Sequence, residues 1–411
     1  MLRMRGDACG RNCCFWSLIV SAGVALLVQE CLIYHFLPLL KAWKDLEAGP
    51  GGLRILLVGD PQIQGHLHEP KGFAGAVTRA DSDRYLAKTF AAAVQFSRPD
   101  LIIFLGDLLD EGVEISALEF VEQSRRFRRI FSATNSIPTI FIAGDNDIGG
   151  ESELVSAKRE QLFQQSFNNS PAFVRLQNGA SLWAQRLVFH EVNVFNDQTR
   201  QLYSPPPSGS SDRVSSPISV VLSHGSVLRD FSRTTMQLLK SLNPVLLLTA
   251  HDHKAWYHAY FPGESYDKRH VSENWLLSER KLLRLNLTRA VVSQSVHEIQ
   301  LPTCSYRMGV PDMGVGLLVL KYDSAGSLLA EFRVLWLLPR FPQLYIYALL
   351  ASLLSVWLTV QIARCCLPLL LHLLLRYCSR HQSQYDHSEM QSLWRSSLRG
   401  QLQYELMLKR C

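Results

Sequence analysis

Acidic and imidazole side chains follow five short apolar runs of this chain, each directly after the run ends. The runs cover residues 53–58, 101–105, 139–143, 220–223 and 245–249. The side chains that follow them are Asp60, Asp107, Asp145, His224, His251 and His253. Carboxylates and imidazoles together bind divalent ions such as Mn, Fe and Zn, and one carboxylate can bridge two of them. Two metal ions about 3.5–4 Å apart can polarise a phosphoryl group and activate water against it.

The five runs are short, branched and almost continuously apolar, which is typical of strands buried on both faces. Between them, helical periodicity fits residues 81–96, 117–131 and 153–167. This alternation predicts an α/β domain, in which ligands bind outside the carboxyl ends of the strands. A single Asp after a strand is most often a cap or turn residue. Five strand ends with carboxylates or imidazoles instead predict one metal site.

The order of these motifs resembles the calcineurin-like metallophosphoesterases. Residues 106–112 (GDLLDEG) match the family's Gly-Asp-x-x-Asp-x-Gly motif, and residues 144–146 and 250–253 match two others with departures. Within the family, the chain is similar to a membrane-anchored branch that removes ethanolamine phosphate from GPI-anchor glycans in the early secretory pathway. Residues 65–66 and 297–307 also resemble that branch. The resemblance implies a two-sheet α/β sandwich with metals at one edge.

Position by position, the resemblance also implies how two divalent ions are held. Asp60, Asp107 and His253 would bind the first ion, and Asp107 would bridge to the second. Asp145, His224 and His251 would complete the second site. We expect Mn²⁺, with Fe, Zn and Mg as alternatives.

Several positions depart from the family pattern. Gln62 stands where the family has a ligand His, and its amide oxygen remains a candidate metal ligand. Asp145 replaces an Asn, and Ala250 replaces a Gly. Asn146 replaces the His that assists the leaving group, and an amide cannot donate a proton as imidazolium does.

Asn146 is nevertheless a candidate catalytic residue, and so is His66, which follows the first motif. His68 is a similar candidate, and the simpler interpretation of both histidines is a surface loop. The groups expected to orient the ligands are Asp110, Asp147 and Asp252.

Two apolar stretches flank the domain. Residues 15–40 are long enough to cross a bilayer, and a cleaved signal peptide is the rival interpretation. Residues 344–375 form the second candidate span, either as one crossing or with an interfacial continuation. Basic residues lie at both chain ends, so the positive-inside rule places residues 1–14 and 376–411 in the cytosol and the domain at 51–339 in the lumen.

Two Asn-x-Ser/Thr triplets, at Asn168 and Asn286, agree with a luminal domain as glycosylation sites. Eight of the nine cysteines lie in or beside the apolar ends, so a disulfide within the domain is excluded. Some of these could be palmitoylated, or they could be ordinary membrane-segment residues. The net charge of +6 comes largely from the flanks, and no Lys/Arg stripe indicates nucleic acid binding.

Three functions remain open. The first is an active phosphodiester hydrolase in the endoplasmic reticulum or Golgi membrane, acting on a GPI glycan or another glycolipid. The second is a metal-holding but catalytically silent module that recognises phosphoglycans or escorts cargo with cargo receptors. The third is a structural membrane protein whose vestigial domain binds no metal.

Overall fold

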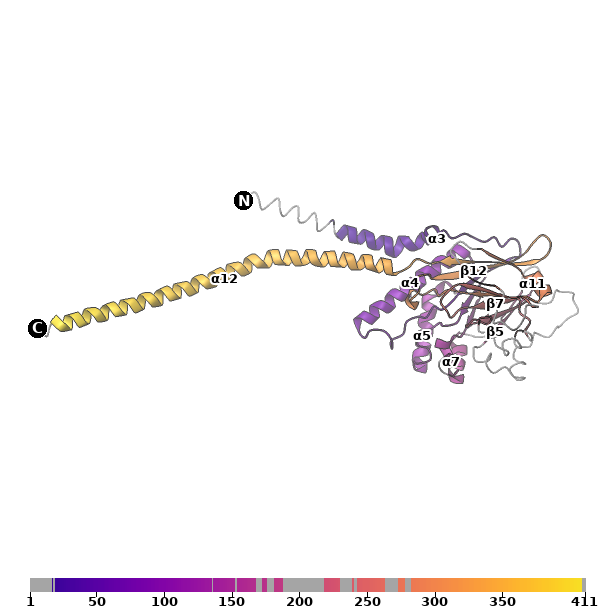
Figure 1. Ribbon diagram of the computed structural model, residues 1–411, viewed down its shortest axis with the longest axis horizontal. Helices are drawn as coiled ribbons and strands as arrows, with labels where there is room; N and C mark the ends of the chain where they lie inside the picture. The colour runs from indigo at the N-terminus through magenta and orange to yellow at the C-terminus, as the bar shows by residue number, and fades with distance from the viewer. Residues whose placement is uncertain are drawn as a thin grey trace. The chain divides into compact units, whose positions relative to one another are not determined.

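The computed structural model describes residues 17, 19–134, 136–151, 154–167, 172–175, 181–187, 218–229, 239, 242–262, 273–277 and 282–408. The chain divides into two compact units. One is Gly23–Gln343, and the other combines Met1–Ala22 with Leu344–Cys411. The sheets belong to the first unit (Figure 1).

Within the described residues, the first sheet has the strand order β10-β13-β12-β1-β2-β3. Its strands are β1 (Leu53–Val58), β2 (Leu101–Leu105), β3 (Thr139–Ile142), β10 (Leu283–Asn286), β12 (Gly314–Tyr322) and β13 (Leu328–Trp336). β1, β2 and β3 are parallel, and Ile55 of β1 lies opposite Leu101 of β2. The carboxyl ends of these three strands therefore lie at one edge.

The second sheet has the order β4-β5-β6-β7-β11-β8-β9 over the part of the chain that the structure describes. Its strands are β4 (Ala172–Arg175), β5 (Ser181–Leu187), β6 (Ile218–Ser223), β7 (Leu246–Thr249), β8 (Trp256–Tyr260), β9 (Glu273–Leu276) and β11 (Val296–Gln300). β5, β6, β7 and β11 are mutually parallel neighbours. Two mixed sheets with helices confirm the predicted two-sheet α/β architecture.

Both faces of β1 are buried, which explains why its sequence is apolar without alternation. Successive side chains of a strand point to opposite faces of the sheet. Ile55 and Leu57 pack in the core between the two sheets, together with Leu248 of β7. Leu56 and Val58 pack in a second core, against the helices that cover the first sheet.

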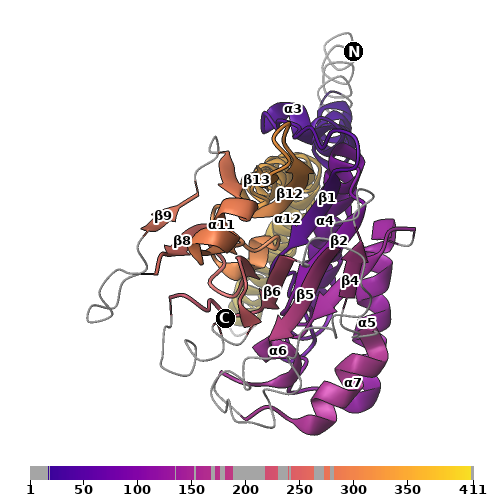
Figure 2. The same ribbon diagram turned by 90° about the vertical axis from the view of Figure 1, so that its right-hand side faces the viewer.

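Helices surround the sheets. Those of the first unit are α2 (Ile33–His35), α3 (Leu37–Leu40), α4 (Phe73–Ser97), α5 (Ala117–Ile130), α6 (Asp145–Ile148), α7 (Ala157–Phe167) and α11 (Leu287–Ser293), with the short turns η1 (Val28–Leu32), η2 (Ser132–Thr134) and η3 (Tyr306–Met308). α4 and α5 lie on the outer face of the first sheet (Figure 2). α5 begins at a capping box in which Ser116 and Glu119 satisfy each other's backbone N–H groups.

Helix starts differ from the sequence expectation. α4 begins at Phe73 and not at residue 81, because its first two turns consist mostly of small apolar residues, which give a weak helical period. α7 begins at Ala157 and not at residue 153. The strands agree with the prediction to within two residues at each end.

The predicted glycosylation site Asn286 ends β10 and caps α11, and its Oδ1 accepts the backbone N–H of Arg289 at 2.8 Å. A glycan is attached through the side-chain nitrogen, which this hydrogen bond does not use. Asn168 lies outside the described residues.

The second half of the predicted N-terminal anchor packs against the domain. Gln29, Glu30, Tyr34 and Leu37 are buried, and the helical path changes from η1 through α2 to α3. Glu30, a costly residue in lipid, has ion-pair partners. Its carboxylate lies 2.7 Å from Arg340 Nη2 and 3.0 Å from Arg84 Nη2.

The last helix, α12 (Phe341–Leu408), continues through Pro368. Within the described residues, its Phe341–Tyr377 part is the one helix long and apolar enough to cross a membrane, judged by length and composition. The apolar helix Ile19–His35 is shorter than that requirement.

Replacing Arg340 with Met should destabilise the domain strongly. The Arg340 side chain is only 3% exposed and pairs with both Glu30 and Asp81, so the change removes the guanidinium that these two carboxylates share and leaves Glu30 with Arg84. Breaking a buried pair in this way costs about 3–5 kcal/mol. Thermal unfolding of the full chain in detergent should show a midpoint several degrees lower.

The matched control is Glu114→Gln, which removes the exposed pair with His68. Such a surface pair is worth about 0–1 kcal/mol. Equal midpoints for the two variants would show that the Arg340 pair does not hold the domain together.

Candidate metal centre

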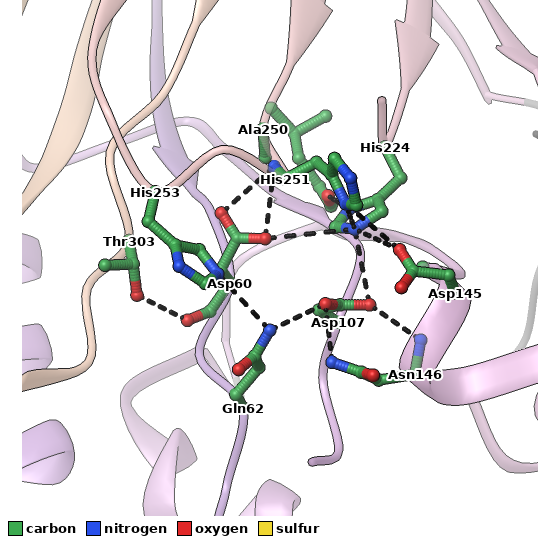
Figure 3. A network of polar contacts seen from close by, with 12 residues as sticks. Asp60, Gln62, Asp107, Asp145, Asn146, His224, Ala250, His251, His253 and Thr303 are labelled. Carbon is green, nitrogen blue, oxygen red and sulfur yellow. Dashed lines mark hydrogen bonds and ion pairs between the residues drawn. The ribbon is translucent and has the colours of Figure 1, made fainter. Parts of the chain in front are cut away.

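The carboxyl ends of strands from both sheets bring the predicted ligands together. Asp60 follows β1, Asp107 follows β2, and Asp145 begins α6 directly after β3. From the second sheet, His224 follows β6, whereas His251 and His253 follow β7. Figure 3 shows all six side chains around one space. The sequence prediction that these six meet at one edge agrees with the structure.

His224 lies at the centre of the cluster. Its Nε2 is 3.0 Å from Asp145 Oδ1, 3.3 Å from Asp107 Oδ1 and 3.9 Å from Asp60 Oδ1. Its Nδ1 is 2.8 Å from the carbonyl oxygen of Leu105 and must donate to it. In the neutral ring Nε2 therefore keeps its lone pair, as a metal ligand requires.

Two groups of donor atoms are close enough to share an ion. Asp145, His224 and His251 form one group, and Asp60, Asp107 and His224 form the other, with all donor atoms of a group within 4.8 Å of one another. The buried Asp145 Oδ1 accepts no hydrogen bond, although His251 Nδ1 lies only 3.1 Å away. Oxygen and nitrogen atoms that converge without hydrogen-bond geometry fit a divalent cation.

Gln62 and Asn146 both hold Asp107. Gln62 Nε2 donates to Asp107 Oδ2 at 2.7 Å, and Asn146 Nδ2 donates to the same oxygen at 2.8 Å. The backbone N–H of Asn146 donates to Asp107 Oδ1 at 3.0 Å. Gln62 Nε2 also lies 3.4 Å from His253 Nε2. The two positions that depart most from the family pattern therefore orient a shared carboxylate.

The ligand loops adopt a backbone conformation that non-glycine residues rarely take. φ is positive at Asp60 (45°), Gln62 (36°), Asp107 (51°), His251 (76°) and His253 (61°). Such conformations cost free energy and persist only where the surrounding structure enforces them. The cluster therefore needs supporting groups around it.

Asp147 supports the loops after β2 and β3. Its buried carboxylate accepts the N–H groups of Gly144 at 2.9 Å, Leu108 at 3.1 Å and Leu109 at 3.0 Å. Burial raises the pKa of Asp147 to about 7. This agrees with the prediction that Asp147 orients its loop.

Strand β11 and the loop after it support three other ligand loops. Thr303 Oγ1 donates to the carbonyl oxygen of Asp60 at 2.7 Å. Gln300 Nε2 donates to the carbonyl oxygen of Ala250 at 2.8 Å, next to His251, and to the carboxylate of Asp252 at 2.5 Å. Glu298 lies on the same strand. Asp252 is thus held by Gln300, and its role in orienting the ligands stays a prediction.

Glu298 is fully buried and accepts hydrogen bonds from the N–H groups of Val227 (3.1 Å) and Leu228 (2.7 Å), in the loop after His224. It also accepts the Thr249 hydroxyl at 2.7 Å. The sequence did not assign roles to Glu298, Gln300 and Thr303. The sequence signal that could have identified them is the stretch at residues 297–307, which resembles the membrane-anchored branch of the family.

The predicted catalytic His66 is not part of the cluster. Its side chain is exposed, and its backbone N–H donates to Glu111 at 2.8 Å. Glu111 also accepts the N–H groups of Leu67 and His68. The His68 ring pairs with Glu114 at 2.8 Å. Among the described residues, the polar contacts of the metal cluster include neither imidazole.

A cavity of about 200 Å³ opens beside Asp145 and Asn146. Its other lining residues are Asp110, Glu111, Val113, Glu114, Gly149, Gly150 and Glu151. Burial raises the pKa of Asp110 to about 6. The cavity reaches the cluster from the side of the β2 and β3 loops.

Burial and mutual contact shift the pKa values of the ligands themselves. Burial raises the pKa of Asp60 to about 7. Burial lowers the pKa of His224, but the neighbouring Asp107 outweighs it and the net shift is upward. For Asp145 the two imidazoles outweigh burial, and its pKa falls. Without a cation, the cluster therefore retains protons near neutral pH.

A family model described as calcineurin-like phosphoesterase matches residues 53–255. Metallophosphoesterase 1 of Danio rerio is 25% identical over 175 residues, which are 42% of this chain and 44% of that protein. Cell division control protein 1 of Saccharomyces cerevisiae is 22% identical over 69% of this chain and 58% of its own length. The chain thus spans about half the length of these curated relatives. A crystal structure of a dimetal phosphatase from Danio rerio aligns at 12% identity and a TM-score of 0.36, over 65% of this chain and 95% of that one.

Thr303→Val should weaken metal binding by about 10–100-fold, the usual effect of losing an outer partner of a ligand. The change keeps the side-chain shape and removes the donor to the Asp60 carbonyl. Mn²⁺ dissociation constants of the full chain, measured from free Mn²⁺ by electron paramagnetic resonance, test this. Thr89→Val is the control, since Thr89 is also buried and bonds the Tyr85 carbonyl within α4. A similar loss in both variants contradicts the assigned role of Thr303.

Mn²⁺ affinity should fall as pH drops below about 7, the pKa of Asp60 before metal binds. Below that pH the carboxyl is protonated and the ion must displace the proton, so affinity falls by about tenfold per pH unit for one proton. Above pH 7 the Asp60 carboxylate is already ionised, so it causes no further rise in Mn²⁺ affinity. The Mn²⁺ dissociation constant, measured at a series of pH values, tests this prediction. An affinity that does not change through pH 7 contradicts it.

Proposed function

Since residues 53–255 form a calcineurin-like phosphoesterase domain, we propose that the protein is a metal-dependent phosphodiester hydrolase at the luminal face of a membrane. One observation carries the proposal. Strands of both sheets end at two groups of carboxylates and imidazoles that share His224, and within each group the donor atoms lie within 4.8 Å of one another. Residues that only cap turns have no reason to converge in this way.

The proposed ligands are Asp60, Asp107 and His253 for one ion and Asp145, His224 and His251 for the other, with Asp107 between them. Bound divalent cations, Mn²⁺ in our proposal, would supply Lewis-acid polarisation of the phosphoryl group and activation of water. Two observations support this division: the donor atoms of Asp145, His224 and His251 lie within 4.8 Å of one another, and His253 Nε2 lies 3.4 Å from Gln62 Nε2, which donates to Asp107 (Figure 3).

The chain's own residues fix the geometry for this chemistry. Gln62 and Asn146 hold the Asp107 carboxylate from the same side. The Leu105 carbonyl fixes the His224 tautomer. No imidazole stands at position 146, so the leaving group receives no proton from this position. A sugar or ethanolamine oxygen that leaves the phosphate would therefore depend on another proton donor or on stabilisation by a bound cation.

The proposed substrate is a phosphodiester on a membrane glycolipid, specifically the ethanolamine phosphate of a GPI-anchor glycan. Its removal would permit transport of GPI-anchored proteins from the endoplasmic reticulum to the Golgi. The support is the similarity to metallophosphoesterase 1, the candidate membrane span and the sequon at Asn286. Both termini would be cytosolic, and contact with cargo receptors fits the same location.

A second candidate function is a silent module that binds phosphoglycans and escorts cargo. The observation that favours it is the contact of Asn146 and Gln62 with Asp107, at positions where the family resemblance implies a catalytic and a ligand imidazole. Such a protein holds metal and recognises phosphate without turnover.

The full chain in detergent should hydrolyse bis(4-nitrophenyl) phosphate with added Mn²⁺, and Asp107→Ala should lower the rate by at least about 10²-fold because the shared carboxylate is lost. The control is Asp312→Ala, an exposed carboxylate. Activity in Asp107→Ala equal to that of the unmodified chain refutes the hydrolase.

The same assay separates the second candidate through Asn146→His. If the unmodified chain binds Mn²⁺ without turnover and the variant gains about 10²–10⁴-fold, the range of general acid catalysis, the silent module is correct. Turnover already present in the unmodified chain argues against it.

A further inference from the structure

Arg340 joins three elements of the first unit at one point. Its guanidinium pairs with Glu30 of η1 and with Asp81 of α4. The next residue in the chain, Phe341, is the first residue of the candidate membrane span. This point is therefore where the chain leaves the domain for the apolar helix, and α4 passes through it.

α4 and the N-terminal helical segment run in the same direction. Glu30 contacts Arg84 and Lys88, and Tyr34 contacts Tyr85. Further along both segments, the Trp43 and Phe96 rings lie 5.3 Å apart. The residues that precede Glu30 in the N-terminal segment include the exposed apolar side chains from Val24 to Val28. Because α4 is parallel to this segment, the residues of α4 that precede Asp81 extend in the same direction as those residues.

The part of α4 before Asp81 is exposed and apolar. Phe73 is 85% exposed and Val77 is 48% exposed. The helix residues between and after them that are exposed are Ala74, Ala76 and Ala80. We call residues 73–80 the α4 tip. An exposed aromatic residue among alanines gains nothing from water, and the polar residues of the tip are Thr78 and Arg79.

The length and charge of the α4 tip fit a bilayer surface. Eight residues separate Phe73 from Asp81, which is about 12 Å along a helix. Lys71 precedes the tip and Arg79 lies near its end, and residues 70–80 contain no acidic residue. Apolar side chains with basic neighbours are typical of helices that enter the interfacial layer of a membrane. Figure 1 shows the start of α4 extending from the domain on the side from which the N-terminal helix arrives.

We propose that the α4 tip inserts into the interfacial layer of the luminal leaflet, with Phe73 and Val77 among the acyl chains and Lys71 and Arg79 at lipid phosphates. This inference rests on the membrane location in the proposed function and not on catalysis. Residues 61–72 connect the tip directly to Asp60, and Glu111 fixes the middle of that connection through three N–H groups. The inserted tip thereby positions the metal centre close to substrates held in the bilayer.

The experiment uses the full chain in vesicles of phosphatidylcholine and phosphatidylserine. A photoreactive benzophenone amino acid replaces Phe73, Val292 or Leu353 in three separate proteins. Val292, on α11, is 82% exposed and matches Phe73 in exposure. Leu353 lies in the candidate span. Mass spectrometry identifies the adducts after illumination.

Lipid adducts at positions 73 and 353, with none at position 292, are the expected result. Adducts at 353 alone overturn the proposed insertion while leaving the anchor intact. A protein adduct at 73 would mean that a second copy or another chain covers the tip, which also overturns it. No lipid adduct at any position refutes the membrane location itself, and with it this inference, but not the hydrolase.

Discussion

The hydrogen bonds that hold the Asp107 carboxylate are the constraint on which the metal centre depends. Three donors from Gln62 and Asn146 fix its two oxygens, and His224 Nε2 lies 3.3 Å from it. The backbone around Asp107 has to leave space for this arrangement. A side chain at Gly106 would collide with the His224 ring, and one at Gly144 would collide with Asp107. Loops from both sheets can therefore approach Asp107 only with this local sequence.

Bringing these carboxylates together carries an electrostatic cost. Asp60 and Asp147 are fully buried near Asp107, and burial raises both their pKa values to about 7. Isolated buried charges are strongly unfavourable, so such groups normally bind protons or cations. The backbone of the ligand loops is held by hydrogen bonds that Thr303 and Gln300 donate to it and that Glu298 accepts from it. The structure thus maintains a site whose charge suits divalent cations.

A second network, around Arg340, links the N-terminal segment to α4 and to the residues that follow β13. Glu30 and Asp81 meet at this guanidinium, which is buried. The ion pairs allow an acidic residue to sit within an apolar segment, because its charge faces the domain. They also fix α4 beside the N-terminal segment.

The sequence by itself determined the five strands that precede the ligands, the order of the ligands and their edge, because buried strands and the residues that follow them leave a local signal. Asp60, Asp107 and His224 are examples. Only the tertiary structure decided that Asn146 and Gln62 hold Asp107, that His66 lies outside the cluster, and that Glu298 and Thr303 support it. These roles depend on which loops meet in space. Glu30 and Arg340 are 310 positions apart in the chain, and no local pattern records their pairing.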